Sequence, residues 1–206
     1  SSPAMTRGIL SEFGTYYKIK RGMQQRDDKA FAKLIKHRFK KFKYLDAEKE
    51  IDNAIECAKQ FEKVLYERQL RNIVGYQAEM VKKLDGLKYP IRCFTDFEFE
   101  NIIVDAKSTM RMPSYPKPDH LRQQALYSKL YGKPTALLYA TPKKTMFYEL
   151  NESDIENGYK EIFNHFKSLE NYIIKCNNNL EEAIKITPLN TDPNPYAWDL
   201  NIKQEA

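Results

Sequence analysis

Residues 91–127, IRCFTDFEFENIIVDAKSTMRMPSYPKPDHLRQQALY, contain the pattern that decides the fold of this chain. Aromatic and branched residues in 89–100 and again in 102–104 predict two strands. Glu100 and Asn101 separate these strands, and asparagine tolerates the left-handed conformation that tight hairpin turns use. The stretch therefore predicts a β-hairpin.

The register of this hairpin places charged residues together. With the turn at Glu100-Asn101, Asp96 lies directly opposite Asp105, and opposed residues share one face with their Cβ atoms about 4.5–5.5 Å apart. Lys107 is two residues beyond Asp105, so both point to the same side of the second strand, whereas Val104 points into a core. The sequence thus predicts two carboxylates and one amine on a single face.

Two neighbouring carboxylates are costly unless a cation or protons neutralise them. Mg²⁺ or Mn²⁺ suits such oxygen ligands, and Lys107 beside the ion would orient or deprotonate a water molecule, or stabilise charge on a phosphate. A solvated hairpin, in which Asp105 and Lys107 simply pair in water, is the alternative. The apolar run from Ile102 to Val104 favours an interior strand, where a charge is costly unless it is paired or binds a metal.

A helix is predicted over 119–131. Asp119 is a suitable N-cap, and Gly132 is typical of the position just past a helix end. Gln123 and Tyr127 lie four residues apart and therefore share one stripe of this helix. On their own they would describe only the boundary of an amphipathic helix.

The combination D–(9)–D-x-K followed by Q-x-x-x-Y resembles the PD-(D/E)XK nuclease superfamily, and within it the RecB-like and phage-type exonucleases. The resemblance covers about residues 73–150. D-x-K alone is common by chance, whereas the apolar strand, D-x-K and Q-x-x-x-Y in this order are more specific. The matching residues are Asp96, Asp105-Ala106-Lys107, Gln123 and Tyr127.

The resemblance implies an enzyme that hydrolyses DNA with Mg²⁺ or Mn²⁺ and leaves 5′-phosphate products. It implies that Asp96, Asp105 and the backbone carbonyl of Ala106 bind the metal. Lys107 would position the water, and Gln123 and Tyr127 would hold the lysine or the DNA. We expect an exonuclease of phage-type DNA replication, recombination or degradation. A structure-specific or restriction-type endonuclease and a catalytically inactive DNA-binding module are the alternatives.

The resemblance also implies an acid on an upstream helix and sometimes a histidine ligand. Apolar residues at helical spacing predict a helix over 46–68, on which Glu56 and Glu62 are candidate metal ligands. His37, on an earlier helix, is the candidate histidine. Each of the three equally fits a solvated or structural role.

Segment 16–43 is strongly basic, with eleven Lys or Arg against two acids in a chain whose formal net charge is +6. Cations interleaved with aromatic rings suit the path of a DNA strand, so we expect DNA with a single-stranded segment or a free end as the partner. The aromatic residues of 30–42 also keep the spacing of an amphipathic helix, so we expect the rings mainly to pack and the cations to reach DNA. The candidate DNA-binding residues are Lys33, Lys36, Arg38, Lys40, Lys41 and Arg122.

The remaining pattern predicts an α/β fold with a central mixed sheet flanked by helices, a restriction-endonuclease-like core, N-terminal basic helices and a long C-terminal helix. Strands are expected over 73–84, 135–141 and 145–150. Ser153 or Asp154 is expected to cap the long helix, which is followed by a short helix over 180–186. The tail 187–206 is expected to be extended and held by Tyr196 and Trp198.

Length and composition fit one domain over residues 1–206, with 1–4 set aside as a cloning scar. No apolar run approaches the ~18 residues that a membrane span needs. The three cysteines are scattered, which suits a reducing compartment and argues against a four-cysteine iron–sulfur cluster. We expect the bacterial cytoplasm, including that of a phage-infected cell.

Overall fold

The computed structural model describes residues 2–20, 28–41, 48–176 and 179. The expected helix over 180–186 and the contacts of Tyr196 and Trp198 lie outside these residues. The elements are α1 (Pro3–Lys20), α2 (Asp28–Lys41), α3 (Glu48–Glu67), β1 (Ile73–Lys82), β2 (Ile91–Phe99), β3 (Ile103–Ser108), α4 (Pro118–Tyr131), β4 (Thr135–Ala140), β5 (Thr145–Glu149) and α5 (Glu152–Lys175).

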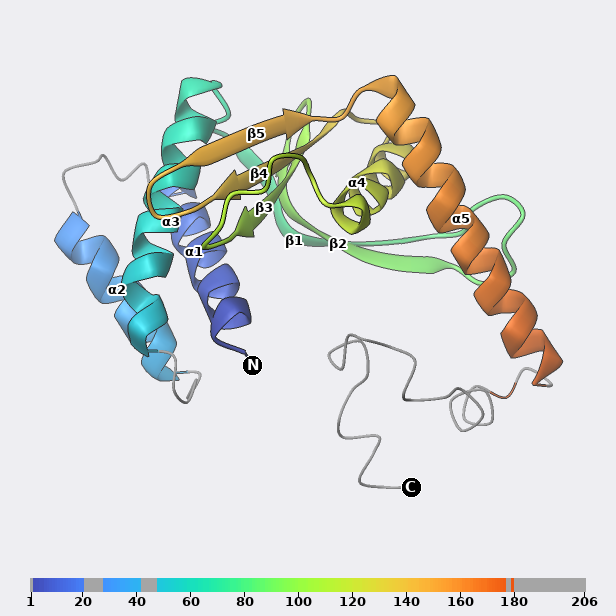
Figure 1. The fold of residues 1–206 in the computed structure, drawn as a ribbon, viewed down its shortest axis with the longest axis horizontal. Coiled ribbons are helices and arrows are strands. Elements are labelled where there is room, and N and C mark those ends of the chain that lie inside the picture. Colours follow the sequence, from blue (N-terminus) through green and yellow to red (C-terminus); the bar gives the residue numbers. More distant parts are fainter. Residues whose placement is uncertain (1, 21–27, 42–47, 177–178, 180–206) are drawn as a thin grey trace.

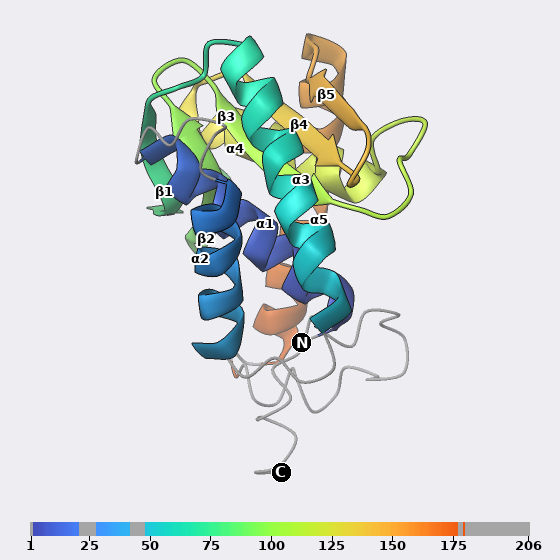
Figure 2. The same cartoon turned by 90° about the vertical axis from the view of Figure 1, so that its left-hand side faces the viewer.

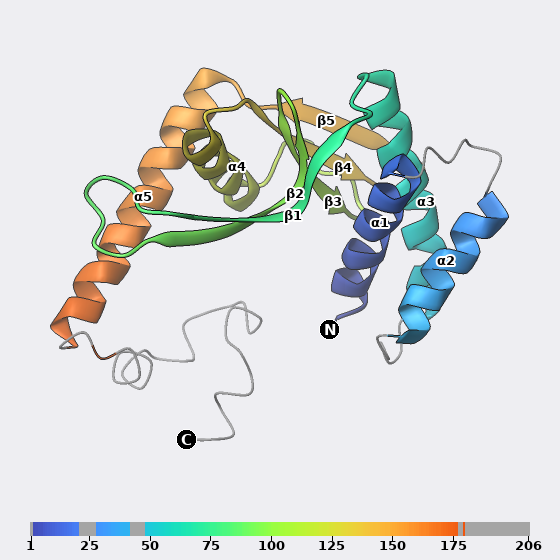
Figure 3. The ribbon, with the colours of Figure 1, turned by 180° about the vertical axis from the view of Figure 1, so that it is seen from behind.

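The sheet is mixed, as predicted, with the order β1-β2-β3-β4-β5. β3 and β4 run parallel, and the other neighbours are antiparallel. Phe97 pairs with Val104 and Glu98 with Ile103, which is the predicted hairpin register. β1 and β2 form a long ribbon that reaches from α1 to α5 (Figures 1 and 3).

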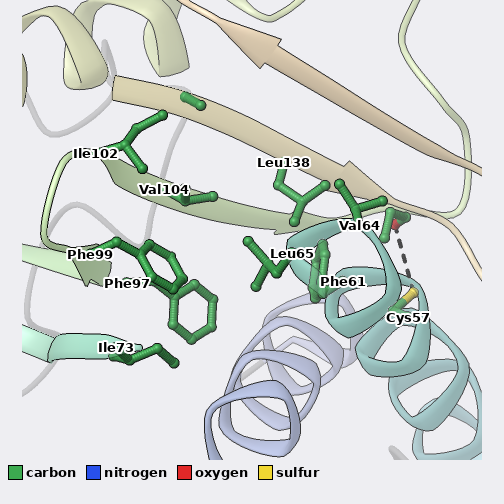
Figure 4. Close-up of a cluster of buried hydrophobic side chains, with 12 residues drawn as sticks. Cys57, Phe61, Val64, Leu65, Ile73, Phe97, Phe99, Ile102, Val104 and Leu138 are labelled. Atoms are coloured by element: carbon green, nitrogen blue, oxygen red, sulfur yellow. Dashed lines mark hydrogen bonds between the residues drawn. The ribbon is translucent and has the colours of Figure 1, made fainter. Parts of the chain in front are cut away.

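α3 covers one face of the sheet. Its Phe61 and Leu65 are fully buried against Phe97 of β2, Val104 of β3 and Leu138 of β4 (Figure 4). The dashed line in Figure 4 marks the contact of the Cys57 thiol with the Ala140 carbonyl oxygen, at 3.6 Å. This packing confirms that Val104 points into a core and leaves the Asp105 side of β3 for the other layer.

α4 and α5 cover the opposite face. Tyr127 and Leu130 of α4 pack with Ile103 of β3 and with apolar residues of α5. The two helices cross closely at Gly158, where a Cβ would lie 2.9 Å from the Cβ of Ala125. A larger residue at Gly158 would therefore push α5 away from α4.

Both predicted N-caps are wrong. α4 begins one residue early because Pro118 occupies its first turn, so Lys117 is the N-cap and Asp119 lies inside the helix. α5 is capped by Asn151, whose side chain accepts a hydrogen bond from the backbone of Asp154 in a capping box. The predicted helix end at Gly132 is confirmed, with a left-handed φ of 66°.

α1, α2 and α3 pack together at one end of the sheet (Figure 2). α1 begins at Pro3, inside the segment set aside as a cloning scar. Among the helices that the structure describes, none combines the length and apolar character that a bilayer crossing requires.

Candidate active site

Asp96 of β2 and Asp105 of β3 lie on the same side of the sheet, opposite the core occupied by Phe97 and Val104. Asp105 is only 1% exposed, and its Oδ2 lies 2.6 Å from Nζ of Lys107. Asp96 Oδ2 accepts a hydrogen bond of 3.0 Å from the backbone N–H of Ala106. Burial and the negative charge of Asp105 raise the pKa of Asp96 well above its ordinary value.

A chain of hydrogen bonds fixes Lys107 to α4. Lys107 Nζ donates to Oε1 of Gln123 at 3.3 Å, and Gln123 Nε2 donates to the hydroxyl of Tyr127 at 3.0 Å. The Tyr127 hydroxyl in turn donates to the Phe94 carbonyl of β2 at 2.7 Å. The residues of the Q-x-x-x-Y motif thus connect the lysine to the strand that carries Asp96.

The protonation of Lys107 limits its chemical role. Burial alone would lower the pKa of this amine, but the carboxylates of Asp105 and Asp96 outweigh burial and raise it. Lys107 therefore stays charged at neutral pH. A charged amine can hold a phosphate oxygen or orient a water molecule, but it has no lone pair with which to act as a general base.

Glu12 of α1 is a third acid at this site, and the sequence reasoning missed it. Burial, followed by the charge of Asp105, raises the pKa of Glu12 from 4.5 to about 7. The hydrogen bond from Gln77, which is second only to burial, and the charge of Lys107 oppose this rise but do not outweigh it. Glu12 is therefore a candidate for the upstream helical acid that the family resemblance implies.

Gln77 of β1 connects two of the three acids. Its amide Nε2 donates to Oε1 of Glu12 and, at 3.4 Å, to Oδ1 of Asp96. The backbone of Gln77 has a φ of 47°, which is uncommon for a residue with a side chain, and the register of β1 shifts just upstream, between Ile73 and Gly75. No sequence signal marks this position, because the distortion depends on pairing with β2.

Of the three upstream candidates, Glu62 and Glu56 pair with lysines and His37 is exposed, so their role as metal ligands stays a prediction. Oε2 of Glu62 lies 2.9 Å from Nζ of Lys18, which is 1% exposed and joins α1 to α3. Glu56 pairs with Lys59 along the same helix at 3.0 Å. His37 is exposed on α2, a helix that packs on α1 and α3.

A structural role of Glu62 in the pair with Lys18 is testable. Glu62→Gln keeps an acceptor for Lys18 but removes the opposite charge, so we expect the free energy of unfolding to fall by about 1–2 kcal/mol. Denaturant titration measures this loss. Turnover of DNA, measured at a temperature where both proteins are folded, should be unchanged; a large loss of turnover without a loss of stability would make Glu62 part of the site.

The DNA-binding candidates fall into two groups. Lys33, Lys36 and Lys40 are exposed on α2, while for Lys41 the structure describes only the helical backbone. The others already have partners: the guanidinium of Arg38 lies 4.6 Å from the ring centroid of Phe13, and Arg122 pairs with Asp119 and, at 3.0 Å, with Glu161. The rings of Phe31 and Phe39 are buried, so they pack, as expected, and are not available for stacking with bases.

The acid cluster suits a hard divalent cation in its chemistry. Three carboxylates share one amine, and burial, together with repulsion by Asp105, raises the pKa of both Glu12 and Asp96. Carboxylate oxygens and a backbone carbonyl such as that of Ala106 are the ligands that Mg²⁺ and Mn²⁺ prefer. Within the described part of the chain, no three His, Cys, Asp or Glu side chains form a ready-made metal cage. The Gln77 amide stands between Glu12 and Asp96, so these carboxylates would have to turn to share an ion.

A search against family models and a search of curated proteins found no match. Among solved structures, the fold is similar to that of a protein from Eubacterium rectale called "Putative exonuclease". The TM-score is 0.54 at 14% sequence identity, over 83% of this chain and 68% of the other. A second structure, SSO0001, has a TM-score of 0.38 at 20% identity, over 55% of this chain and 56% of the other. The first likeness supports the α/β fold.

Proposed function

We propose that this protein is a Mg²⁺- or Mn²⁺-dependent deoxyribonuclease that acts as an exonuclease. The observation that carries the proposal is the cluster of Glu12, Asp96 and Asp105 around a charged, half-buried Lys107. The fold shared with the Eubacterium rectale protein supports it, as does the resemblance of the D–(9)–D-x-K and Q-x-x-x-Y motifs to RecB-like and phage-type exonucleases.

Each side chain of the cluster has a role in phosphodiester hydrolysis. Glu12, Asp96, Asp105 and the Ala106 carbonyl would hold the cation, which lowers the pKa of bound water and stabilises charge on the phosphate. Lys107 attracts a phosphate oxygen and orients the attacking water. Gln123 and Tyr127 keep the lysine in place, so little order has to be gained when DNA binds.

Water attacks phosphorus, the bond to the 3′-oxygen breaks, and the products carry a 5′-phosphate and a 3′-hydroxyl. The exposed lysines of α2 would bind the phosphates of a strand that enters the site, and this binding should weaken with salt. DNA replication, recombination or degradation of the phage type, in a bacterial cytoplasm, is the context we propose.

The test is digestion of end-labelled linear DNA and of covalently closed circles with Mg²⁺, with Mn²⁺ and with EDTA. We expect degradation of the linear DNA with either metal, no cutting of the circles, and no activity in EDTA. Lys107→Ala should retain DNA binding but lose cleavage. Lys63→Ala is the matched control, because this lysine is 60% exposed and pairs only loosely with Glu67, at 3.9 Å.

Other results of this digestion would support one of the alternative functions. Cutting of closed circles would indicate an endonuclease of the structure-specific or restriction type. DNA binding without cleavage under any metal would indicate an inactive binding module. Equal cleavage by wild type and Lys107→Ala would place the chemistry elsewhere on the protein.

A further inference from the structure

His120 lies in the first turn of α4, one turn before Gln123, so both residues face the same side of the helix. Its Nδ1 is 2.6 Å from the hydroxyl of Tyr139. Tyr139 is 2% exposed and pairs with Lys107 in the parallel register of β3 and β4. The Tyr139–His120 pair therefore flanks the lysine on the side of β4.

The hydrogen bonds of Tyr139 determine which nitrogen of His120 carries the proton. The Tyr139 oxygen accepts a hydrogen bond of 3.3 Å from the backbone N–H of Lys117. Its single O–H then needs an acceptor, and Nδ1 of His120 is the one that the described residues provide. If Nδ1 accepts this bond, the proton of a neutral imidazole resides on Nε2.

The electrostatic surroundings keep His120 neutral. Burial, followed by the positive charge of Lys107, lowers the pKa of His120 to about 4, and Lys117 acts in the same direction. Asp105 and Asp119 oppose this effect but do not outweigh it. At neutral pH the ring is a hydrogen-bond donor that does not repel Lys107.

We propose that His120 contacts the substrate, donating from Nε2–H to a phosphate oxygen of DNA bound beside Lys107, with Tyr139 as the positioning residue that sets the tautomer. The proposal rests on the proposed nuclease function. It follows from three observations: the ring is only partly buried, its Nδ1 edge is occupied by Tyr139, and Tyr139 pairs with Lys107 across β3 and β4. A donor here would supplement Lys107, whose amine already contacts Asp105 and Gln123.

Nitrogen NMR of the imidazoles tests the tautomer without reference to catalysis. The chain has three histidines, and the other two, His37 and His165, are exposed. His120→Gln assigns the signals. In wild type at pH 7 we expect the His120 proton on Nε2, and in Tyr139→Phe a shift toward a mixture of tautomers. A proton on Nδ1 of His120 in wild type would overturn the proposal.

A second measurement tests the contact with phosphate. A short single-stranded oligonucleotide, added in EDTA so that it is not cut, should shift the His120 Nε2–H signal more than the His165 signal. An unmoved His120 signal under saturating oligonucleotide would refute the contact.

Kinetics complete the test. We expect His120→Ala to lower kcat about 10²-fold, the cost of removing one well-placed donor. His120→Gln should recover most of this loss, because its amide nitrogen reaches the position of Nε2. Wild-type kcat in His120→Ala would overturn the proposal. Failure of the nuclease function is a separate result, because it would appear as no cleavage by wild type itself, whatever the tautomer.

Discussion

Asp105→Asn is expected to lower kcat for DNA hydrolysis by about 10³-fold or more. Asp105 is 1% exposed between Asp96 and Lys107, so its charge acts in a medium that screens weakly. Loss of one preorganised electrostatic group in such a site costs about 10²–10³-fold, and here the same carboxylate would also hold the cation. Single-turnover digestion of end-labelled DNA measures the change.

The fold should tolerate this substitution. Asp96 and Glu12 still supply negative charge near Lys107, and removal of Asp105 relieves the repulsion that raises the pKa of Asp96. We therefore expect the free energy of unfolding in EDTA to change by less than about 1 kcal/mol. Asp119→Asn is the matched control, because Asp119 is 80% exposed and bonds Arg122; it should leave both stability and kcat close to wild type. Asp105→Asn with more than a tenth of wild-type kcat would contradict the catalytic role.

The part of the site that could be predicted from sequence is the part built by local rules. A two-residue turn fixes which residues of β2 and β3 face each other, and alternation fixes the side on which Asp105 and Lys107 lie. The spacing of Gln123 and Tyr127 on one helix is equally local. The shared face of Asp96, Asp105 and Lys107 and the shared stripe of Gln123 and Tyr127 therefore follow from sequence separation, once the turn at Glu100-Asn101 is identified.

Glu12 could not be found this way, because its position depends on how α1 packs. The buried face of α1 consists largely of small or polar residues, so its hydrophobic periodicity is weak; the buried residues are Thr6, Arg7, Leu10, Ser11, Gly14, Thr15 and Lys18. The small residues Ser11, Gly14 and Thr15 on one side of the helix were the available signal. A Cβ at Gly14 would lie 2.8 Å from the side chain of Ile35, so α1 and α2 are closely packed. The apolar stripe of α3, by contrast, is clear in the sequence, and the predicted acids Glu56 and Glu62 lie on that helix.

Glu12→Gln is expected to gain stability relative to wild type as the pH rises in EDTA. An acid whose pKa is raised by folding, here from 4.5 to about 7, binds more protons in the folded protein than in the unfolded one. The stability of wild type therefore falls as the pH rises through this window, whereas glutamine does not titrate. The difference between the two proteins should change by roughly 3 kcal/mol between pH 4.5 and pH 7. Folding lowers the pKa of His120, so this residue gives both proteins the opposite dependence of stability on pH. Its contribution cancels when the two proteins are compared.

A divalent cation should reverse the dependence of wild-type stability on pH, because carboxylates must lose their protons to bind a metal. In wild type, the increase in Tm produced by Mn²⁺ should grow from pH 5.5 to pH 8 as Glu12 ionises, and in Glu12→Gln it should be smaller and depend less on pH. Glu62→Gln provides the comparison for an acid outside the cluster, and its Mn²⁺ response should match wild type. The contrary result is that the stabilities of Glu12→Gln and wild type change in parallel with pH and respond equally to Mn²⁺. Glu12 would then titrate as an ordinary surface acid. The cation would in that case be held by Asp96 and Asp105 without help from α1.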